Sequence, residues 1–318
     1  MRQLELGAVG ITVAKLSEAI EMATHGIDDI FIANQVTQAV KMKGLCELHE
    51  NINLIVGADH PEQIEILAKA LNGSSKKLPI RIEIDCGFGR CGLHPEDPKL
   101  IELAQNISRS TCLKLDGLFT HAGQAYLAKS YNHVKQIAGH EASAILYAKK
   151  QLEKSGIEIA NTSVGSTPTA REVIQKPGIS EARPGNYIFY DGIQQALGVC
   201  SSSQCSLFVL ATVTAQPDTK RVICDAGSKA LNLDKGAHSA MLLDHFGQLT
   251  GLKGRVTRVS EEHGIIDLEN NQTVKIGSPL LIIPNHACVV ANLYKEYNLI
   301  TENKTVQTLP ISARGMSQ

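Results

Sequence analysis

The sequence lacks a basic block or stripe. It has 31 lysine and arginine residues against 32 aspartate and glutamate residues, which gives a formal net charge of −1. We therefore expect no non-specific nucleic-acid binding and no adhesion to anionic membranes. No apolar run approaches the roughly 18–20 residues that a membrane span needs. The first residues, MRQLELGAVG, lack the pattern of a secretion signal.

Several motifs that would define other protein classes are also missing. The eight cysteines are scattered and do not form a small disulfide framework, which predicts a protein of the reducing cytoplasm. His140 and Glu141 are followed by Ala144 where a zinc-protease helix has its second histidine. There is no Walker loop, and GFGRCG has the wrong spacing for a dinucleotide-binding fingerprint.

Short β-rich runs alternate with amphipathic helical patterns up to about residue 200, which predicts parallel β/α units. The expected strands are 10–15, 28–34, 51–59, 78–85, 113–121, 157–164 and 179–189. An open doubly wound sheet tolerates this number of strands, whereas a closed barrel of this type has eight. The first residues resemble the end of a helix with Gly7 as its C-cap. A TIM-type (β/α)8 barrel would therefore lack its first strand.

After about residue 200 the helical period nearly disappears. Strand-like runs such as CSLFVLATVTAQ, KRVICDAGSKAL and HACVVANLY follow one another, with turn residues between them. We predict two domains, an α/β barrel over 1–199 and a mostly antiparallel β domain over 200–318, with the serine-rich segment 200–205 at the junction.

The segment VGSTPTAREVI (164–174) is the strongest local candidate for a binding site. Ser166 or Thr167 can cap a helix with Pro168 in its first turn, and the N–H groups at such a helix start can bind an anion. An ordinary capped helix would have the same sequence. If a first strand is missing, however, this loop and the one containing Gly185 and Asn186 follow strands seven and eight, where barrels of this kind often hold phosphate.

Two further clusters follow predicted strands. Arg90 lies in the glycine-rich segment EIDCGFGRCGL, and His121 and Tyr126 lie in FTHAGQAY. Active sites of barrels lie at the carboxyl ends of the strands. Taken singly, each residue favours an ordinary structural role: Arg90 a solvated loop arginine, His121 a loop histidine and Tyr126 a packed side chain.

His286 and Cys288 interrupt an apolar run near the end of the chain. On a strand, residues two apart point to the same side, so the imidazole and the thiolate can share one ion, and this ligand pair suits zinc. Two protein ligands leave room for water and substrate, as at a catalytic ion. Two unrelated residues on a buried strand are the alternative.

Nine segments in this order resemble the D-serine dehydratase and D-threonine aldolase group. They are GAVGITVAKLSEA, DDIFIANQV, EIDCGFGRCGL, THAGQAY, VGSTPT, RPGNYIFYD, DAGSKAL, SEEHG and PNHACVVANLY. This group belongs to the alanine-racemase-like, fold-type III pyridoxal-phosphate enzymes. The resemblance spans essentially the whole chain. It implies a pyridoxal-phosphate-binding barrel, a C-terminal β domain, a small D-amino acid as substrate and a homodimer.

The resemblance also assigns roles to residues of this sequence. The cofactor-binding residues would be Ser166, Thr167, Gly185 and Asn186 at the phosphate, Tyr126 and His121 near the ring and Arg90 near the phenolic oxygen. His286 and Cys288 would hold a metal ion, Zn²⁺ or alternatively Mn²⁺ or Mg²⁺.

The Schiff-base lysine of the family lies on the first barrel strand, in a segment that this sequence does not contain. Lys15 and Lys229 are poor substitutes, because Lys15 matches an ordinary position of the family and Lys229 lies in a turn.

The resemblance implies a lyase that eliminates water and ammonia from a β-hydroxy-D-amino acid. Aldolases of the group more often have aspartate at the second metal position, so Cys288 favours the dehydratase. A D-threonine aldolase is the first alternative. A non-catalytic protein that keeps the phosphate site but has no Schiff-base lysine is the second.

Overall fold

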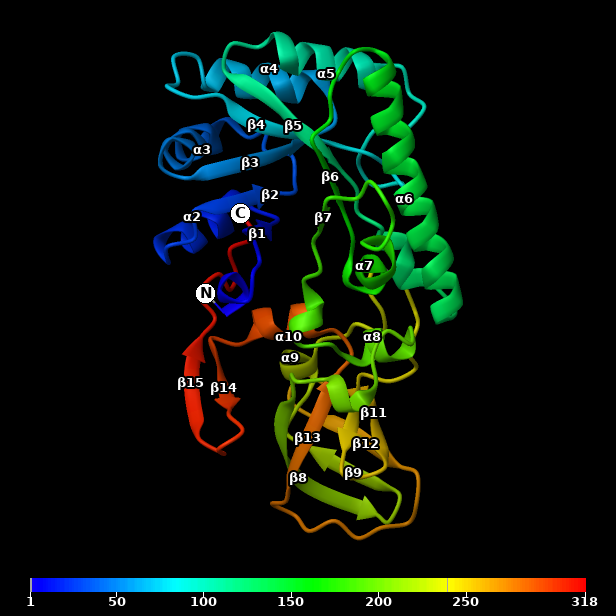
Figure 1. Ribbon diagram of the computed structural model, residues 1–318. Coiled ribbons are helices and arrows are strands. Elements are labelled where there is room, and N and C mark those ends of the chain that lie inside the picture. The colour runs from blue at the N-terminus through cyan, green and yellow to red at the C-terminus, as the bar shows by residue number, and fades with distance from the viewer. Residues whose placement is uncertain (1, 239) are drawn as a thin grey trace. The chain divides into compact units, whose positions relative to one another are not determined.

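The structure is a computed structural model that describes residues 2–238 and 240–318. The chain forms two compact units (Figure 1). The first runs from the N-terminus to Ala122, from Lys135 to Arg183 and from Gly315 to Gln318. The second comprises Gly123–Val134 and Pro184–Arg314. Over the described residues, no helix combines the length and the apolar character needed to cross a membrane.

Strands and helices alternate along the first unit. Its elements are α1 (Arg2–Glu5), β1 (Ile11–Val13), α2 (Leu16–Thr24), β2 (Asp29–Ile32), α3 (Ala39–Asn51), β3 (Asn53–Ala58), α4 (Pro61–Ala70), β4 (Leu78–Glu83), α5 (Lys99–Arg109), β5 (Leu113–Phe119), α6 (Tyr131–Lys154), β6 (Asn161–Val164), α7 (Thr167–Val173) and β7 (Glu181–Ala182).

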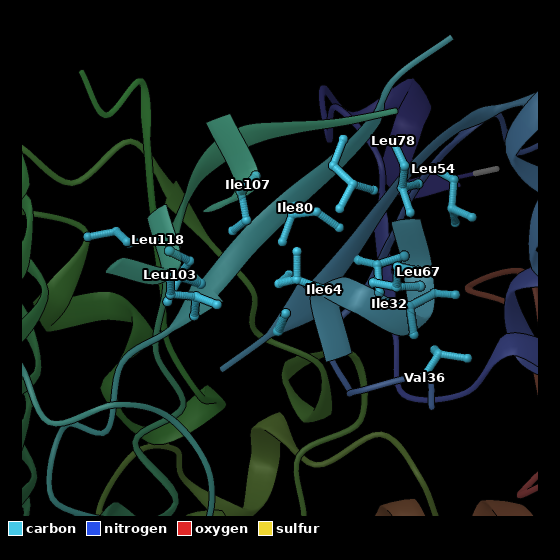
Figure 2. Packing of buried hydrophobic residues seen from close by; sticks show 14 of the residues in the cluster. Ile32, Val36, Leu54, Ile64, Leu67, Leu78, Ile80, Leu103, Ile107 and Leu118 are labelled. Carbon is cyan, nitrogen blue, oxygen red and sulfur yellow. The ribbon is translucent and has the colours of Figure 1, made fainter. Parts of the chain in front are cut away.

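Over the described residues the seven strands form one sheet in the order β1 to β7, and every neighbouring pair is parallel. Helices α2 to α6 lie along the outer side of this sheet (Figure 1). Strand residues alternate between the two faces of a sheet. Ile30, Ile32, Ile80 and Ile82 accordingly belong to the main hydrophobic cluster, in which strand side chains pack against helix side chains. Figure 2 shows this packing, with Ile64 and Leu67 of α4 and Leu103 and Ile107 of α5 beside the strand residues.

The other face of the sheet carries aromatic and charged side chains. The rings of Phe31 and Phe119 meet edge to face with centroids 5.0 Å apart. The guanidinium of Arg81, on β4, lies 4.8 Å from the Phe31 ring centroid and 2.7 Å from both Asp116 on β5 and Glu181 on β7. Neighbouring strands lie roughly 4.8 Å apart, so β4 and β7 would be about 14 Å apart in a flat sheet. A single side chain that bridges them shows that the sheet curls around this face.

The second unit is built mainly from antiparallel strands. Its elements are the 3₁₀ helices η1 (Gly123–Leu127), η2 (Asn186–Ile188) and η3 (Ser202–Gln204), the helices α8 (Gly192–Ala196), α9 (Ser228–Leu231) and α10 (Ala287–Leu293), and the strands β8 (Val209–Asp218), β9 (Arg221–Cys224), β10 (Gly247–Thr250), β11 (Gly254–Val259), β12 (Gly264–Leu268), β13 (Pro279–Pro284), β14 (Glu296–Ile300) and β15 (Val306–Pro310).

Within the described chain, six strands close into a barrel in the order β10-β11-β12-β9-β8-β13, and β14 and β15 form a separate hairpin. The barrel interior is filled by side chains that include Val213, Val222, Val256, Ile266 and Ile282. The predicted succession of parallel β/α units and an antiparallel β unit is thereby confirmed. The seven parallel strands form a half-barrel, because β1 and β7 are the edges of the sheet.

Three local expectations were wrong. The strand predicted at 157–164 begins only at Asn161, and the strand predicted at 179–189 is limited to the two residues of β7. Pro184 lacks the N–H that a strand ladder needs, and the chain then turns into η2. After residue 200 the chain also contains two helices: α9 ends the strand-like run KRVICDAGSKAL, and α10 replaces the strand expected over HACVVANLY. The boundary predicted between 199 and 200 remains a prediction, and the compact units separate at Arg183 and Pro184.

We predict that Ile80→Ala lowers the free energy of unfolding by about 3 kcal/mol. Ile80 is fully buried between the sheet and its helices, so its truncation leaves a cavity. Urea unfolding followed by circular dichroism measures the loss. Val40→Ala is the control, because Val40 is 87% exposed on α3 and its truncation should change stability by less than about 0.5 kcal/mol. Equal effects of the two substitutions would contradict this packing.

Candidate functional site

The loop between β6 and α7 is held by one buried carboxylate. Glu141, on α6, is fully buried. It accepts hydrogen bonds from the Gly165 N–H at 2.8 Å, from Thr120 Oγ1 at 2.9 Å and from Thr169 Oγ1 at 2.8 Å. Gly165 has a φ of +105°, a conformation that favours glycine. The start of α7 is therefore fixed by a side chain that sequence analysis did not select.

Ser166 and Thr167 lie where this loop enters the helix. Ser166, one of the two cap residues that the sequence allowed, is the N-cap of α7, and both side chains are buried. Ser166 Oγ donates a hydrogen bond to the carbonyl oxygen of Ala122 at 3.3 Å. The segment with His121 and the loop with Ser166 thus meet at the carboxyl ends of β5 and β6.

Arg90 and His121 are connected through one aromatic ring. The Phe88 ring lies edge to face with the His121 ring, with centroids 5.9 Å apart, and 5.3 Å from the guanidinium carbon of Arg90. Arg90 also lies 3.8 Å from Glu83 Oε1 and keeps 47% of its side chain exposed. The first unit therefore brings Arg90 and His121 together, and the Ser166 contact with Ala122 joins the α7 loop to the same group.

Arg183 is a second residue that sequence analysis missed. It directly follows β7, donates to Ser163 Oγ at 2.5 Å and also donates to the carbonyl oxygen of Thr120. Burial lowers the pKa of Arg183 to about 10, against the opposing effect of Glu181 and Glu141. The guanidinium stays charged at neutral pH and supplies a fixed positive charge next to the ends of β5 and β6.

In the second unit, Asp191 organises the segment that contains His286 and Cys288. Asp191 is fully buried and precedes α8. Its Oδ2 accepts from the Ala287 N–H at 2.9 Å and from Asn186 Nδ2 at 2.6 Å, and its Oδ1 accepts from the Gln194 N–H at 2.9 Å. Burial raises the pKa of Asp191, although these donors lower it. One carboxylate therefore joins η2, α8 and the start of α10.

His286 and Cys288 lie at the N-terminus of a helix and not on a strand, which corrects the sequence prediction. His286 is the N-cap of α10, and Cys288 is in the first turn. Their side chains are nevertheless close enough to hydrogen-bond. The reasoning from residues two apart on a strand was wrong, but the two side chains do meet.

The surroundings of this pair favour positive charge. His286 Nδ1 lies 2.7 Å from Asp234 Oδ2, and Asn186 Nδ2 lies 3.8 Å from Cys288 Sγ. Burial lowers the pKa of His286, but hydrogen bonds to Cys288 and Asp234 outweigh this effect and raise the pKa to about 9. An imidazole nitrogen and a sulfur beside carboxylates match the ligands that zinc prefers, so the residues present fit a metal ion.

Tyr126 and Asn186 lie next to this pair. Burial raises the pKa of Tyr126 well above its ordinary value, and Cys288 and Asp191 act in the same direction, so the phenol keeps its proton. The Tyr126 ring lies 5.1 Å from the His238 ring, centroid to centroid. The side-chain amide of Asn186 is committed to Asp191 and Cys288. A phosphate contact from Asn186 or from Gly185 would therefore come from the backbone.

The predicted residues thus form two groups, one in each unit. Arg90, His121, Ser166 and Thr167 belong to the first, and the second is completed by Tyr126, Gly185, Asn186, His286 and Cys288. For the phosphate end of pyridoxal phosphate, the first group offers a buried helix start, two hydroxyl groups and the charge of Arg183, which fit an anion.

The two lysines considered as substitutes for the Schiff-base lysine are unsuited to it. Lys229 is exposed, and its Nζ lies 2.5 Å from Glu262 Oε1, which raises its pKa. A nucleophilic lysine needs a lowered pKa. Lys15 is the N-cap residue of α2 at the end of β1.

Comparison with known proteins identifies the family. Residues 1–192 match the model of the alanine racemase N-terminal domain, and residues 206–300 match the model of the serine dehydratase domain. The D-serine dehydratase of Dictyostelium discoideum is 30% identical over 321 residues, which cover 93% of this chain and 80% of that protein. This chain belongs to the alanine-racemase-like D-serine dehydratase and D-threonine aldolase family. Proteins of this family depend on pyridoxal phosphate.

Other members are similarly distant. The D-threonine aldolase of Arthrobacter sp. is 29% identical and matches 100% of this chain and 82% of its own length. The solved D-threo-3-hydroxyaspartate dehydratase of Delftia sp. HT23 is 29% identical with a TM-score of 0.88, covering 97% of this chain and 85% of that one. An alanine racemase of Clostridium difficile 630 shares the fold, with 15% identity and a TM-score of 0.66 over 97% of this chain and 86% of that one.

We predict that Glu141→Ala destabilises the protein by about 3 kcal/mol, because three buried donors lose their acceptor. The released loop should also bind pyridoxal phosphate more weakly. Urea unfolding measures the first effect, and titration of the cofactor followed by its absorbance measures the second. Glu158→Ala, at an exposed position, removes the same charge and is the control. Wild-type stability in Glu141→Ala would contradict the role of this carboxylate.

Proposed function

We propose that this chain is a pyridoxal-phosphate- and zinc-dependent lyase that converts a β-hydroxy-D-amino acid such as D-serine into a 2-oxo acid and ammonia, and that it acts as a homodimer. The observation that carries the proposal is the His286–Cys288 pair, which is held by Asp191 and Asp234. The dehydratases among the relatives support it.

Two solved variants of a related dehydratase support a metal at this pair. D-threo-3-hydroxyaspartate dehydratase has been solved with a cysteine-to-alanine substitution in a metal-free form, and also with a histidine-to-alanine substitution two positions away from that cysteine. His286 and Cys288 have the same order and spacing. A thiolate ligand favours Zn²⁺ over Mn²⁺ or Mg²⁺, which prefer oxygen ligands.

The cofactor assignments follow from the family resemblance and include residues of both groups. Ser166 and Thr167 would hold the phosphate, with backbone contacts from Gly185 and Asn186. Arg90 would lie near the phenolic oxygen, and His121 and Tyr126 near the ring. When bound, pyridoxal phosphate supplies an electron sink that makes the α-proton of an amino acid removable.

A metal ion held by His286 and Cys288 would explain how the β-hydroxyl group can leave. Hydroxide is a poor leaving group, and a Lewis acid at the β-hydroxyl stabilises the charge that develops on its oxygen. His286 and Cys288 would hold that ion. The phenol of Tyr126, in the same unit, keeps its proton because burial and the negative groups around it raise its pKa. For D-serine the overall products are pyruvate and ammonia, with water released and taken up again.

We predict that the protein, supplied with pyridoxal phosphate and Zn²⁺, forms a 2-oxo acid and ammonia from D-serine, D-threonine or D-threo-3-hydroxyaspartate. A dehydrogenase-coupled assay detects the oxo acid, and ammonia is measured separately. His286→Ala and Cys288→Ala should remove this activity, because each deletes a metal ligand. Cys46→Ala, a cysteine substitution on α3 in the other unit, is the control and should retain it.

A D-threonine aldolase is the competing candidate, favoured by the aldolases among the relatives. On D-threonine it would release glycine and acetaldehyde, whereas the lyase releases 2-oxobutyrate and ammonia. Glycine as the main product would replace our proposal by the aldolase. Cofactor binding without turnover of any of these substrates would indicate the non-catalytic protein.

A further inference from the structure

Asp234 contacts two consecutive residues at the start of α10. Its Oδ2 lies 2.7 Å from Nδ1 of His286, and its carbonyl oxygen accepts a hydrogen bond from Asn285 Nδ2 at 3.0 Å. Asn285 is itself buried and also donates to the carbonyl oxygen of His245 at 2.5 Å. The position of Asp234 relative to the imidazole is therefore fixed through both its backbone and its side chain.

The carboxylate of Asp234 occupies one of the two ring nitrogens of His286. Among the described residues, the group of three potential ligands whose atoms all lie within 4.8 Å of one another is Asp59, Glu83 and Cys91. Asp234, His286 and Cys288 do not form such a group, because at least one pair of their ligand atoms lies farther apart than this distance. With Nδ1 taken by Asp234, the nitrogen that remains for a ligand is Nε2.

We propose that Asp234 is a positioning residue that fixes the tautomer and orientation of His286 for metal binding. Its carboxylate accepts a hydrogen bond from the Nδ1–H of His286, which leaves the lone pair of Nε2 for the ion. The same hydrogen bond increases the basicity of the ring. A carboxylate hydrogen-bonded to a ligating histidine typically contributes a factor of roughly 10–100 to metal affinity. This inference rests on the metal pair of the proposed function, but it concerns a residue that is not itself a ligand.

The test measures Zn²⁺ affinity and needs no turnover. The full-length protein is freed of metal, and its Kd for Zn²⁺ is determined by competition with a chromophoric chelator. We expect Asp234→Ala to raise the Kd by roughly 10–100-fold. Asp234→Asn keeps an oxygen that accepts the Nδ1–H hydrogen bond, so it should bind Zn²⁺ severalfold more tightly than Asp234→Ala. Asp244→Ala is the matched control, because the Asp244 side chain is 85% exposed in the same unit.

Two further measurements separate positioning from a purely structural role. The metal-free Asp234→Asn protein should keep the wild-type circular dichroism spectrum and a cooperative melting transition, although the loss of the charge beside the protonated His286 lowers its melting temperature. Wild type and Asp234→Asn should also both show the thiolate-to-metal absorption band after loading with Co²⁺, which reports on Cys288. If Asp234→Ala is too unstable to assay, the Asp234→Asn variant decides the question.

Three results would overturn the inference. Wild-type Zn²⁺ affinity in Asp234→Ala would show that the carboxylate has no effect on the ion. Equal loss in Asp234→Asn and Asp234→Ala would assign Asp234 as a direct ligand. Zn²⁺ binding that is the same in wild type and His286→Ala would show that the metal pair itself is wrong, and with it the metal part of the proposed function.

Discussion

Both units of this chain depend on the cost of burying a carboxylate. An ionised carboxylate removed from water is tolerated only where donors surround it. Glu141 satisfies this condition with one backbone N–H and two threonine hydroxyls, and Asp191 does so with two backbone N–H groups and an asparagine amide. Because the donors come from segments far apart in the sequence, each carboxylate fixes where those segments meet.

At both proposed binding sites, a buried carboxylate accepts a backbone N–H at the start of a helix. Glu141 accepts the N–H of Gly165, just before α7, and Asp191 accepts the N–H of Ala287, the first residue of α10. Negative charge near a helix N-terminus is favourable, since the N–H groups there carry partial positive charge. In each case the residues to which we assign the ligand lie beside the held position. A short loop becomes a rigid site because a buried side chain from another element fixes its backbone.

The sequence indicated most of the fold and the residue types of the site, but not the interactions that hold them. The alternation of strands and helices predicted the parallel unit, because apolar periodicity depends on which face is buried. The short helix at 287–293 was taken for a strand, since two valines and an apolar run match either structure over so few residues. His286 and Cys288 were identified through their chemistry. Asp191 and Asp234 could not be identified in this way, because only the folded chain brings them to the segment that contains His286 and Cys288.

The choice between dehydratase and aldolase rests on few atoms, because relatives of both kinds match this chain over nearly its whole length. What can differ between them is how strongly the ion polarises the β-hydroxyl and which bond then breaks. A thiolate at position 288 gives a softer ion centre than a carboxylate would. The hydrogen bond that His286 Nδ1 donates to Asp234 would make the imidazole a stronger ligand of the same ion. In the proposed site, Cys288 as a ligand and Asp234, 52 positions from His286 in the sequence, would together set how strongly the ion polarises the β-hydroxyl.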